Sequence, residues 1–421
     1  MAARPAHGRR CGARQGLPRG APGRGRRRAR LRTPRSAGGP AHGRQVGAVV
    51  AFRVRTITAG DHAAFNASQP AVSFLQTPAW ASVKSEWGSE SLGWFDDRDQ
   101  LVGAGLVLYR RLPGVKTSLA YLPEGPVIDW ASDDLAGRLG PLVEHLKRSG
   151  AFAIRIGTTV AARTWSAATV KAAIADPGIT RLSDVPPDTV NDVAAQARVQ
   201  LRHLGWRPPK EDEGFSAGQP RWVFQVPLAG KDENQLLKGM NQLWRRNIKK
   251  AGKAGVVVTQ GGIGDLPDFY RVYLETAKRD HFIPRPFSYF PAVFEALLAE
   301  DKDRIRLYLA HHEGDLVAAT IWIRVGQHAW YSYGASSTAK REVRGSNAVQ
   351  WQMVTDALAA GCTVYNLRGI TDTVDENDPH LGLIQFKVGT GGEAVEYLGE
   401  WDLPLNRLLY KAFDVYMSRR S

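Results

Sequence analysis

One pattern of apolar segments occurs twice in this chain, about one domain apart. Residues 99–112 (DQLVGAGLVLYRRL) predict a charged turn and a buried strand, and residues 313–325 (EGDLVAATIWIRV) repeat that order. Farther along each half, residues 142–157 and 352–369 both indicate a helix, a glycine stop and an apolar strand. We interpret the two pairs as an internal duplication, the alternative being chance similarity between common helix–strand segments. Hairpins, helices and strands in this order predict a mixed-sheet α/β architecture.

The basic charge of the chain is concentrated at its beginning. Residues 1–45 hold thirteen arginines and no Lys, Asp or Glu, whereas the rest carries 43 basic against 41 acidic residues. The segment has too few large apolar residues to fold and no apolar stretch typical of a signal peptide. We therefore treat 1–50 as a disordered Arg-rich tail or a mis-annotated start near 49–50. A tail could touch RNA or anionic lipid, and a targeting peptide is the third alternative.

Cysteine and hydropathy patterns exclude several classes of protein. The two cysteines, Cys11 and Cys362, cannot make a disulfide framework or a cysteine-rich metal site, which favours a reducing cytoplasm. No apolar run reaches the ~18 residues of a membrane span. Histidines and acids show no metal-ligand spacing, so we expect no metal and no cofactor.

A hairpin followed by strand, helix and strand resembles the GNAT acyltransferase superfamily. These enzymes hold the coenzyme A pyrophosphate on backbone amides at a helix start, in a Q/R-x-x-G-x-G/A loop. At the matching place, residues 334–351 have Gly345 but also Glu342 and Asn347 at unsuitable positions, and the first half is rich in acids there. Neither half offers a good coenzyme A site, so an acyl donor other than coenzyme A is expected.

Seven short motifs resemble the FemABX family of aminoacyl-tRNA-dependent transferases, which build interpeptide bridges on peptidoglycan precursors. Each is weak alone, but together they follow the family's order from about residue 52 to 418. The motifs are FLQTPAWASVKSEWG (74–88), YLPEGPVID (121–129), NQLWRRNIKKAGKAGV (241–256), TAKRDHFIPRPFSYF (276–290), WYSYGASS (330–337), YNLRGI (365–370) and GLIQFKVGTGGE (382–393).

The resemblance implies two tandem GNAT-like domains, in agreement with the repeat. The polar, Gly/Pro-rich stretch 208–221 is the best boundary. We place domain 1 at 51–215 plus 400–421, because the last helix of the family packs back on the first domain, and domain 2 at 216–399. No heptad run is present, so the chain resembles family members without a coiled-coil arm.

Lys387 lies in an apolar run just before the glycine loop GTGG. By resemblance, Phe386 and Lys387 match the family pair that faces the oxyanion formed as the aminoacyl ester breaks. The alternative is a lysine that extends from a strand end to water.

Three residues match family positions that hold the nucleotide-diphosphate end of the precursor. They are Lys84, on a predicted helix that it shares with Trp80, and the pair Arg285 and Tyr289. Arginine can bind phosphate as a fork, and lysine adds a point charge. The alternatives are a solvated helix lysine and an arginine that caps a loop.

Tyr331 and Tyr333 alternate with Ser332, so we expect both phenols on one face of a strand, in contact with the stem peptide. They could equally be ordinary sheet tyrosines. Asp129 could assist proton removal or bind a substrate cation, or could cap the following helix. In the best-understood relatives an acid thought to act as base follows the next strand, but 153–160 (AIRIGTTV) contains none, so the general base is unassigned.

The helix predicted over 241–253 is basic. It carries the residues that we assign to phosphate contacts with tRNA, with a solvated basic face as the alternative: Arg245, Arg246, Lys249, Lys250 and Lys253.

The resemblance implies transfer of an amino acid, for instance glycine, from aminoacyl-tRNA to the side-chain amine of lipid II or UDP-MurNAc-pentapeptide. We expect a cytoplasmic monomer that contacts the inner face of the plasma membrane peripherally. The alternatives are a coenzyme A-dependent N-acyltransferase, a non-catalytic RNA- or envelope-binding module, and aminoacylation of a lipid or protein N-terminus.

Overall fold

The computed structural model describes residues 51–112, 114–209 and 218–418. The predicted tail, 1–50, lies outside the described residues, as does 210–217 within the predicted domain boundary.

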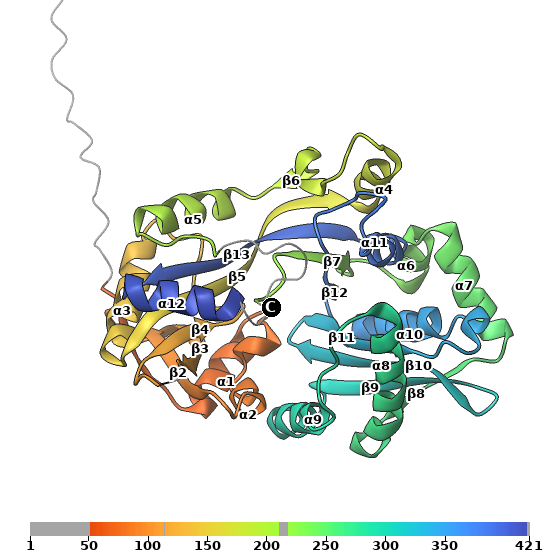
Figure 1. Ribbon diagram of the computed structural model, residues 1–421, viewed down its shortest axis with the longest axis horizontal. Helices are drawn as coiled ribbons and strands as arrows, with labels where there is room; N and C mark the ends of the chain where they lie inside the picture. Colours follow the sequence, from red (N-terminus) through yellow and green to blue (C-terminus); the bar gives the residue numbers. More distant parts are fainter. Residues whose placement is uncertain (1–50, 113, 210–217, 419–421) are drawn as a thin grey trace, which may run out of the picture. The chain divides into compact units, whose positions relative to one another are not determined.

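The described strands form a single mixed sheet (Figure 1). Its order is β1-β2-β3-β4-β5-β13-β7-β12-β11-β10-β9-β8, and β6 pairs with β5 beside this path. The strands are β1 (Arg53–Thr56), β2 (Gly88–Phe95), β3 (Leu101–Arg111), β4 (Ser118–Leu122), β5 (Ala151–Ser166), β6 (Thr189–Val190), β7 (Trp222–Pro227), β8 (Val257–Gly261), β9 (Ile305–His312), β10 (Asp315–Val325), β11 (His328–Ser336), β12 (Val364–Gly369) and β13 (Glu393–Pro404).

Helices follow the strands in chain order. They are α1 (Ala59–Ser68), α2 (Ala79–Val83), α3 (Leu135–Arg148), α4 (Ala167–Ala175), α5 (Asp192–His203), α6 (Glu233–Gly239), α7 (Gln242–Lys253), α8 (Leu266–Asp280), α9 (Tyr289–Glu300), α10 (Gly345–Ala359), α11 (Leu381–Val388) and α12 (Arg407–Ser418). None of the described helices is both long enough and apolar enough to cross a bilayer.

The two halves of the sheet have the same topology. In the first, β1 to β4 are antiparallel neighbours and β5 is parallel to β4; in the second, β8 to β11 are antiparallel and β12 is parallel to β11. The repeated sequence segments form β3 and β10, and α3–β5 and α10–β12. Gly150 and Gly361, the predicted stops, have the positive φ that ends a helix. The mixed-sheet fold is confirmed, and the two repeated segments occupy matching places in the two halves.

β13 joins the two halves. It pairs antiparallel with β5 along its whole length and with β7 over residues 393–396. After it, α12 returns to the first half, where Phe413 packs on Phe152 with ring centroids 5.6 Å apart. The return of the last helix is thus confirmed, while the exact domain boundaries stay a prediction.

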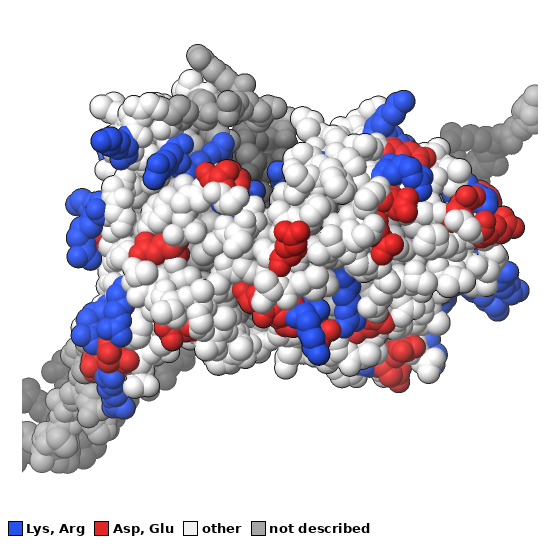
Figure 2. Space-filling model, turned by 90° about the horizontal axis from the view of Figure 1, so that it is seen from below, with Lys and Arg blue, Asp and Glu red and all other residues white. Residues whose placement is uncertain are grey.

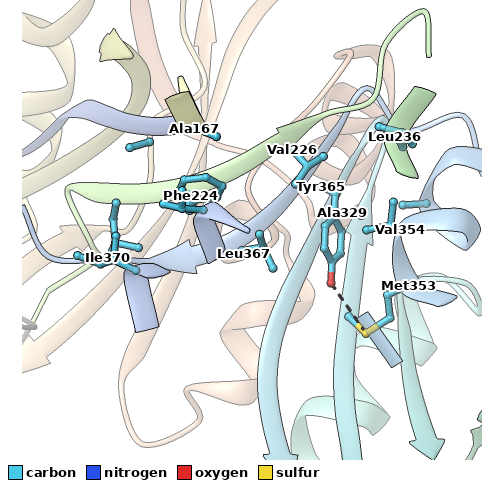
Figure 3. Packing of buried hydrophobic residues seen from close by; sticks show 14 of the residues in the cluster. Ala167, Phe224, Val226, Leu236, Ala329, Met353, Val354, Tyr365, Leu367 and Ile370 are labelled. Atoms are coloured by element: carbon cyan, nitrogen blue, oxygen red, sulfur yellow. Dashed lines mark hydrogen bonds between the residues drawn. The ribbon is translucent and has the colours of Figure 1, made fainter. Parts of the chain in front are cut away.

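The apolar core also continues from one half into the other. Figure 3 shows Phe224 and Val226 of β7 beside β12, which contributes Tyr365 and Leu367. Ala167, at the start of α4, belongs to the same cluster. α4, which directly follows β5, is therefore packed together with the second half, whereas α5 packs in the core of the first half.

Two local features depend on pairing between distant segments. β5 is much longer than β4, because β13 pairs with it as far as Ser166. After β4, the chain touches β3 again through one bridge, between Val127 and Ala104.

Candidate active site

Lys387 lies in the last turn of α11 and is 3% exposed. Its Nζ donates hydrogen bonds to the carbonyl oxygens of Gly369 (2.6 Å) and Arg368 (3.4 Å). A lysine ammonium has three donors, so one remains for another acceptor. Burial, with a smaller effect from the Arg368 charge, lowers the pKa of Lys387 to about 7. The alternative, a lysine that extends from a strand end to water, is thus wrong, because the Lys387 ammonium is held inside the protein.

An aromatic pair packs α7 against α11. The rings of Trp244 and Phe386 are 4.8 Å apart, and Trp244 Nε1 donates to the Phe386 carbonyl oxygen at 2.9 Å. Close contacts explain why the loop after α11 is rich in glycine. A Cβ at Gly389 would collide with the Trp244 ring, and one at Gly392 would collide with a β7 carbonyl. The chain can therefore place Lys387 here only with glycines behind it.

An ion pair beside Lys387 links the two halves of the chain. Glu124 follows β4, is 8% exposed and accepts from Arg368 Nη1 at 2.9 Å and from the hydroxyl of Ser73. Arg368, in β12, also donates to Gln219 Oε1 at 3.0 Å. Both Glu124 and Arg368 have positive φ, which L side chains rarely adopt. The pair therefore holds the backbone whose carbonyls accept from Lys387.

Sequence reasoning missed this pair, although both residues lie inside motifs that it used. The available signal was an acid before Gly-Pro in YLPEGPVID and an arginine before glycine in YNLRGI. Neither pattern shows that the two side chains meet, because 244 residues separate them.

A second group of predicted residues gathers where α2 packs on α9 (Figure 1). The Tyr289 ring lies 6.0 Å from Lys84 Nζ and 5.5 Å from the Arg285 guanidinium. The Tyr333 hydroxyl donates to the Tyr289 hydroxyl at 3.0 Å. The chain thus brings together residues from three separate segments: Lys84, the pair Arg285 and Tyr289, and Tyr333. Lys84 directly follows α2 as its C-cap, close to the predicted helical position.

Cations repel one another in this second group. Burial lowers the pKa of Lys84, and the charges of Arg285 and Arg110 lower it further, while Glu86 at 3.8 Å opposes them. Arg285 has no carboxylate within ion-pair distance among the described residues. Positive charges held near each other are favourable only once an anion binds between them.

Arg368 also lies close to this second group. Its charge acts on the Tyr289 phenol, whose pKa is nevertheless raised by burial and by Tyr333. Its guanidinium is 5.5 Å from the ring of Phe74, which packs on Trp80 of α2. Arg368 thus lies next to Lys387 and also next to the residues that surround the second group.

Tyr331 and Tyr333 do not share a face of β11, contrary to the prediction. A bulge at Ser332 shifts the register, so that Tyr333 pairs with Ile321 and Tyr331 with Trp322. Tyr333 packs toward the second group, whereas Tyr331 packs against the core on the other face. Burial raises the pKa of Tyr331 to about 12. Its predicted contact with the stem peptide has no support from this placement.

Asp129 stands apart from both groups. Its carboxylate is 55% exposed, pairs with Arg138 at 3.2 Å and accepts from the Ala131 amide. The alternative of a helix cap is wrong, because Asp134 caps α3. A catalytic role for Asp129 stays a prediction.

The predicted basic helix is α7, and its five basic side chains are exposed while Trp244 and Asn247 face inward. Elsewhere the charge is mixed: on the face shown in Figure 2, Lys and Arg are interspersed with Asp and Glu. Within the described residues no group of His, Cys, Asp and Glu is placed to hold a metal ion.

Two copies of one strand order in a shared sheet, with a buried lysine bonded to carbonyls of β12, define a mixed α/β protein built from two similar halves. The model of the FemAB family matches residues 57–312 and 309–417. The chain belongs to the FemAB family.

Relatives of known name cover most of the chain. A lipid II:glycine glycyltransferase of Staphylococcus saprophyticus is 24% identical over 422 residues, covering 85% of this chain and 94% of the relative. That of Staphylococcus epidermidis is 25% identical over 422 residues, covering 84% and 93%. A crystal structure of FemX has a TM-score of 0.71 at 23% identity, covering 86% of this chain and 99% of that one.

Proposed function

We propose that this protein transfers an amino acid from aminoacyl-tRNA to the stem-peptide amine of a peptidoglycan precursor. Family membership and relatives named lipid II:glycine glycyltransferase support the class of reaction. The observation that carries the proposal is the buried Lys387 ammonium, held by two carbonyls with one donor left over.

The reaction is aminolysis of an ester. The amine nitrogen attacks the ester carbonyl carbon, a tetrahedral oxyanion forms, and the C–O bond to the tRNA ribose then breaks. The proton lost by the attacking amine passes to water or a substrate group and balances the alkoxide that leaves. No covalent intermediate with the protein is needed, because an ester is already activated relative to the amide product.

In this mechanism the third donor of Lys387 faces the oxyanion. A charged donor in a water-poor site stabilises developing negative charge strongly, because its neighbours are already oriented. A pKa of about 7 leaves a substantial charged fraction at neutral pH. The rings of Phe386 and Trp244 keep the surroundings of Lys387 apolar.

The cluster of Lys84, Arg285, Tyr289 and Tyr333 would bind the diphosphate of the precursor. Two cations that disfavour each other are stabilised by a dianionic group between them, and the phenols supply further donors. The buried side of α7 packs directly on α11. The exposed basic side of α7 would contact the tRNA phosphates.

The test replaces Lys387 with methionine, which keeps the length of the side chain and removes the charge. Loss of one oxyanion donor lowers kcat about 10²–10³-fold, while binding of the precursor and of charged tRNA stays within about twofold. Turnover is measured by mass spectrometry with charged tRNA and lipid II or UDP-MurNAc-pentapeptide. Unchanged turnover in this variant would contradict the proposed role.

Two controls separate this function from the alternatives. A coenzyme A titration that saturates at micromolar concentration, together with acetyl transfer, would favour the N-acyltransferase. Binding of RNA without turnover by the unmodified protein on any charged tRNA would favour a non-catalytic module.

A further inference from the structure

The loop between α8 and α9, residues 281–288, displays apolar side chains to solvent. Ile283 is 95% exposed, the highest value among the large apolar side chains described, and Phe282 and Phe287 are 38% and 39% exposed. Other exposed apolar residues of the described chain are scattered over separate elements. Exposed apolar groups that cluster on one loop indicate contact with another surface.

This α8–α9 loop is anchored at its base. Tyr270 Oη donates to the Arg285 carbonyl oxygen at 3.3 Å, and the Arg285 amide donates to Tyr273 Oη at 3.4 Å. Phe282 packs on Tyr273 and Phe287 on Tyr270, with ring centroids 5.5 and 5.3 Å apart. The two phenylalanines thus fix the base, and Ile283 projects from it without a partner of its own in the described residues.

Basic residues flank the tip in the sequence. Lys278 and His281 are exposed beside it, and Arg285 follows two residues later. Neither Lys278 nor Arg285 has a carboxylate within ion-pair distance in the described part of the chain. Of the neighbouring acids, Asp280 is paired with Arg279, and Glu275 accepts from the Thr338 amide. An apolar tip with cationic flanks is the pattern that binds the interface of an anionic bilayer.

Ile283 lies close in the chain to Arg285 of the second group, and this position favours a bilayer over a protein partner. Ile283 and Arg285 are two residues apart, so at most about 7 Å of backbone separates them. The diphosphate of a lipid-linked substrate lies in the headgroup layer, directly above the acyl chains. A protein interface would need about 800 Å² of contiguous surface on this side, whereas the loop offers one projecting side chain, Ile283, and two partly exposed phenylalanines.

We propose that the α8–α9 loop is a membrane-contact surface, in which Ile283 enters the acyl-chain boundary of an anionic leaflet and Arg285 and Lys84 receive the diphosphate of a lipid-linked precursor. This inference rests on the proposed function and makes the lipid-linked precursor, rather than the nucleotide-linked one, the preferred acceptor.

The first experiment measures partitioning of the full chain onto phosphatidylcholine vesicles in which about one lipid in three is phosphatidylglycerol, an anionic lipid. Ile283→Ser is expected to bind about tenfold more weakly, from the transfer free energy of one isoleucine side chain. Val190→Ser, at a 63% exposed valine of β6, is the matched control and is expected to bind like the unmodified protein. Equal binding by all three proteins would overturn the proposal. Equal melting temperatures confirm that the variants are folded.

A position-specific readout removes the contribution of the arginines in 1–45. Ile283→Cys in a Cys11→Ser background carries an environment-sensitive dye, since Cys362 is buried. The emission should shift to the blue on addition of vesicles, and a dye at Val190→Cys should not shift. No shift at position 283 would overturn the proposal even if the protein binds vesicles.

The second experiment compares two acceptors. Ile283→Ser should lower the rate about tenfold with lipid II in vesicles and leave the rate with UDP-MurNAc-pentapeptide in solution unchanged. A similar loss with both acceptors, or with neither, would overturn the inference. If the unmodified protein turns over neither acceptor, the proposed function fails, while the vesicle and dye measurements still decide whether the loop binds membrane.

Discussion

Burial of the Lys387 ammonium costs folding free energy, and the cost depends on pH. In the unfolded chain this lysine has a pKa near 10.5, whereas burial lowers the value in the folded protein to about 7. Between these values the unfolded state binds the extra proton, so this group makes the fold more stable as pH rises. A residue that serves the proposed chemistry thus weakens the fold at neutral pH.

Lys387→Met should remove this pH dependence. From pH 7 to about 10, the free energy of unfolding of the unmodified protein should rise relative to the variant by about 1.4 kcal/mol per pH unit. Below pH 7 the difference between them should be constant. Urea unfolding at pH 6, 7, 8.5 and 10 measures this, and parallel values for the two proteins across that range would contradict a buried, pKa-shifted Lys387.

Glu124→Gln tests the ion pair that holds the Lys387 acceptors. Arg368, 20% exposed in its side chain, would be left without its carboxylate, so the free energy of unfolding should fall by about 3 kcal/mol. Because the pair positions Lys387 rather than the precursor, kcat should fall while the KM for the precursor stays the same. Glu295→Gln, at an exposed position of α9, is the control. A change in KM alone would show that Glu124 contacts the precursor instead.

At the scale of elements, α7 and α11 form one unit through Trp244. The buried side of α7 contacts the helix of Lys387, so its basic side must face outward, next to the site. Any polyanion bound along α7 would therefore pass close to the buried ammonium.

Reversal of charge on α7 should weaken the binding of charged tRNA. The double variant Lys249→Glu, Lys253→Glu should raise the KM for aminoacyl-tRNA about tenfold or more and reduce the salt dependence of binding, because fewer counterions are released. Lys147→Glu, on α3, is a control with an exposed lysine in the other half. If all variants bind tRNA equally, α7 is a solvated basic face.

The sequence predicted elements better than it predicted which side chains meet. The repeat around β3 and β10 predicted the mixed sheet and its two similar halves, because local hydrophobic patterns are repeated there, whereas the order of the strands was not predicted. The bulge at Ser332 reversed the expected face of Tyr331, because one extra residue leaves no mark in an alternating pattern. Glu124 and Arg368 were missed because their contact depends on backbone conformations with positive φ and on long-range packing.

At the scale of the whole molecule, one sheet and a shared core couple the two halves. β13 hydrogen-bonds to β5 of the first half and to β7 of the second, and Ala167 packs among residues of β7 and β12. Neither half can lose its structure without exposing strand edges and apolar surface of the other.

The described body should therefore unfold in a single cooperative transition. Near-UV and far-UV circular dichroism should give the same midpoint, and the calorimetric and van't Hoff enthalpies should agree. Two separated transitions, or midpoints that differ between the two signals, would show that the halves are independently stable domains.

The central position of β13 also governs how the protein is made. A ribosome emits this strand after both of its neighbours, β5 and β7, have been synthesised. Until then β5 and β7 each present an unpaired edge, which can capture another strand from a nascent or neighbouring chain. The two halves of the sheet can therefore join only once β13 has been made, and during that interval the exposed edges favour aggregation.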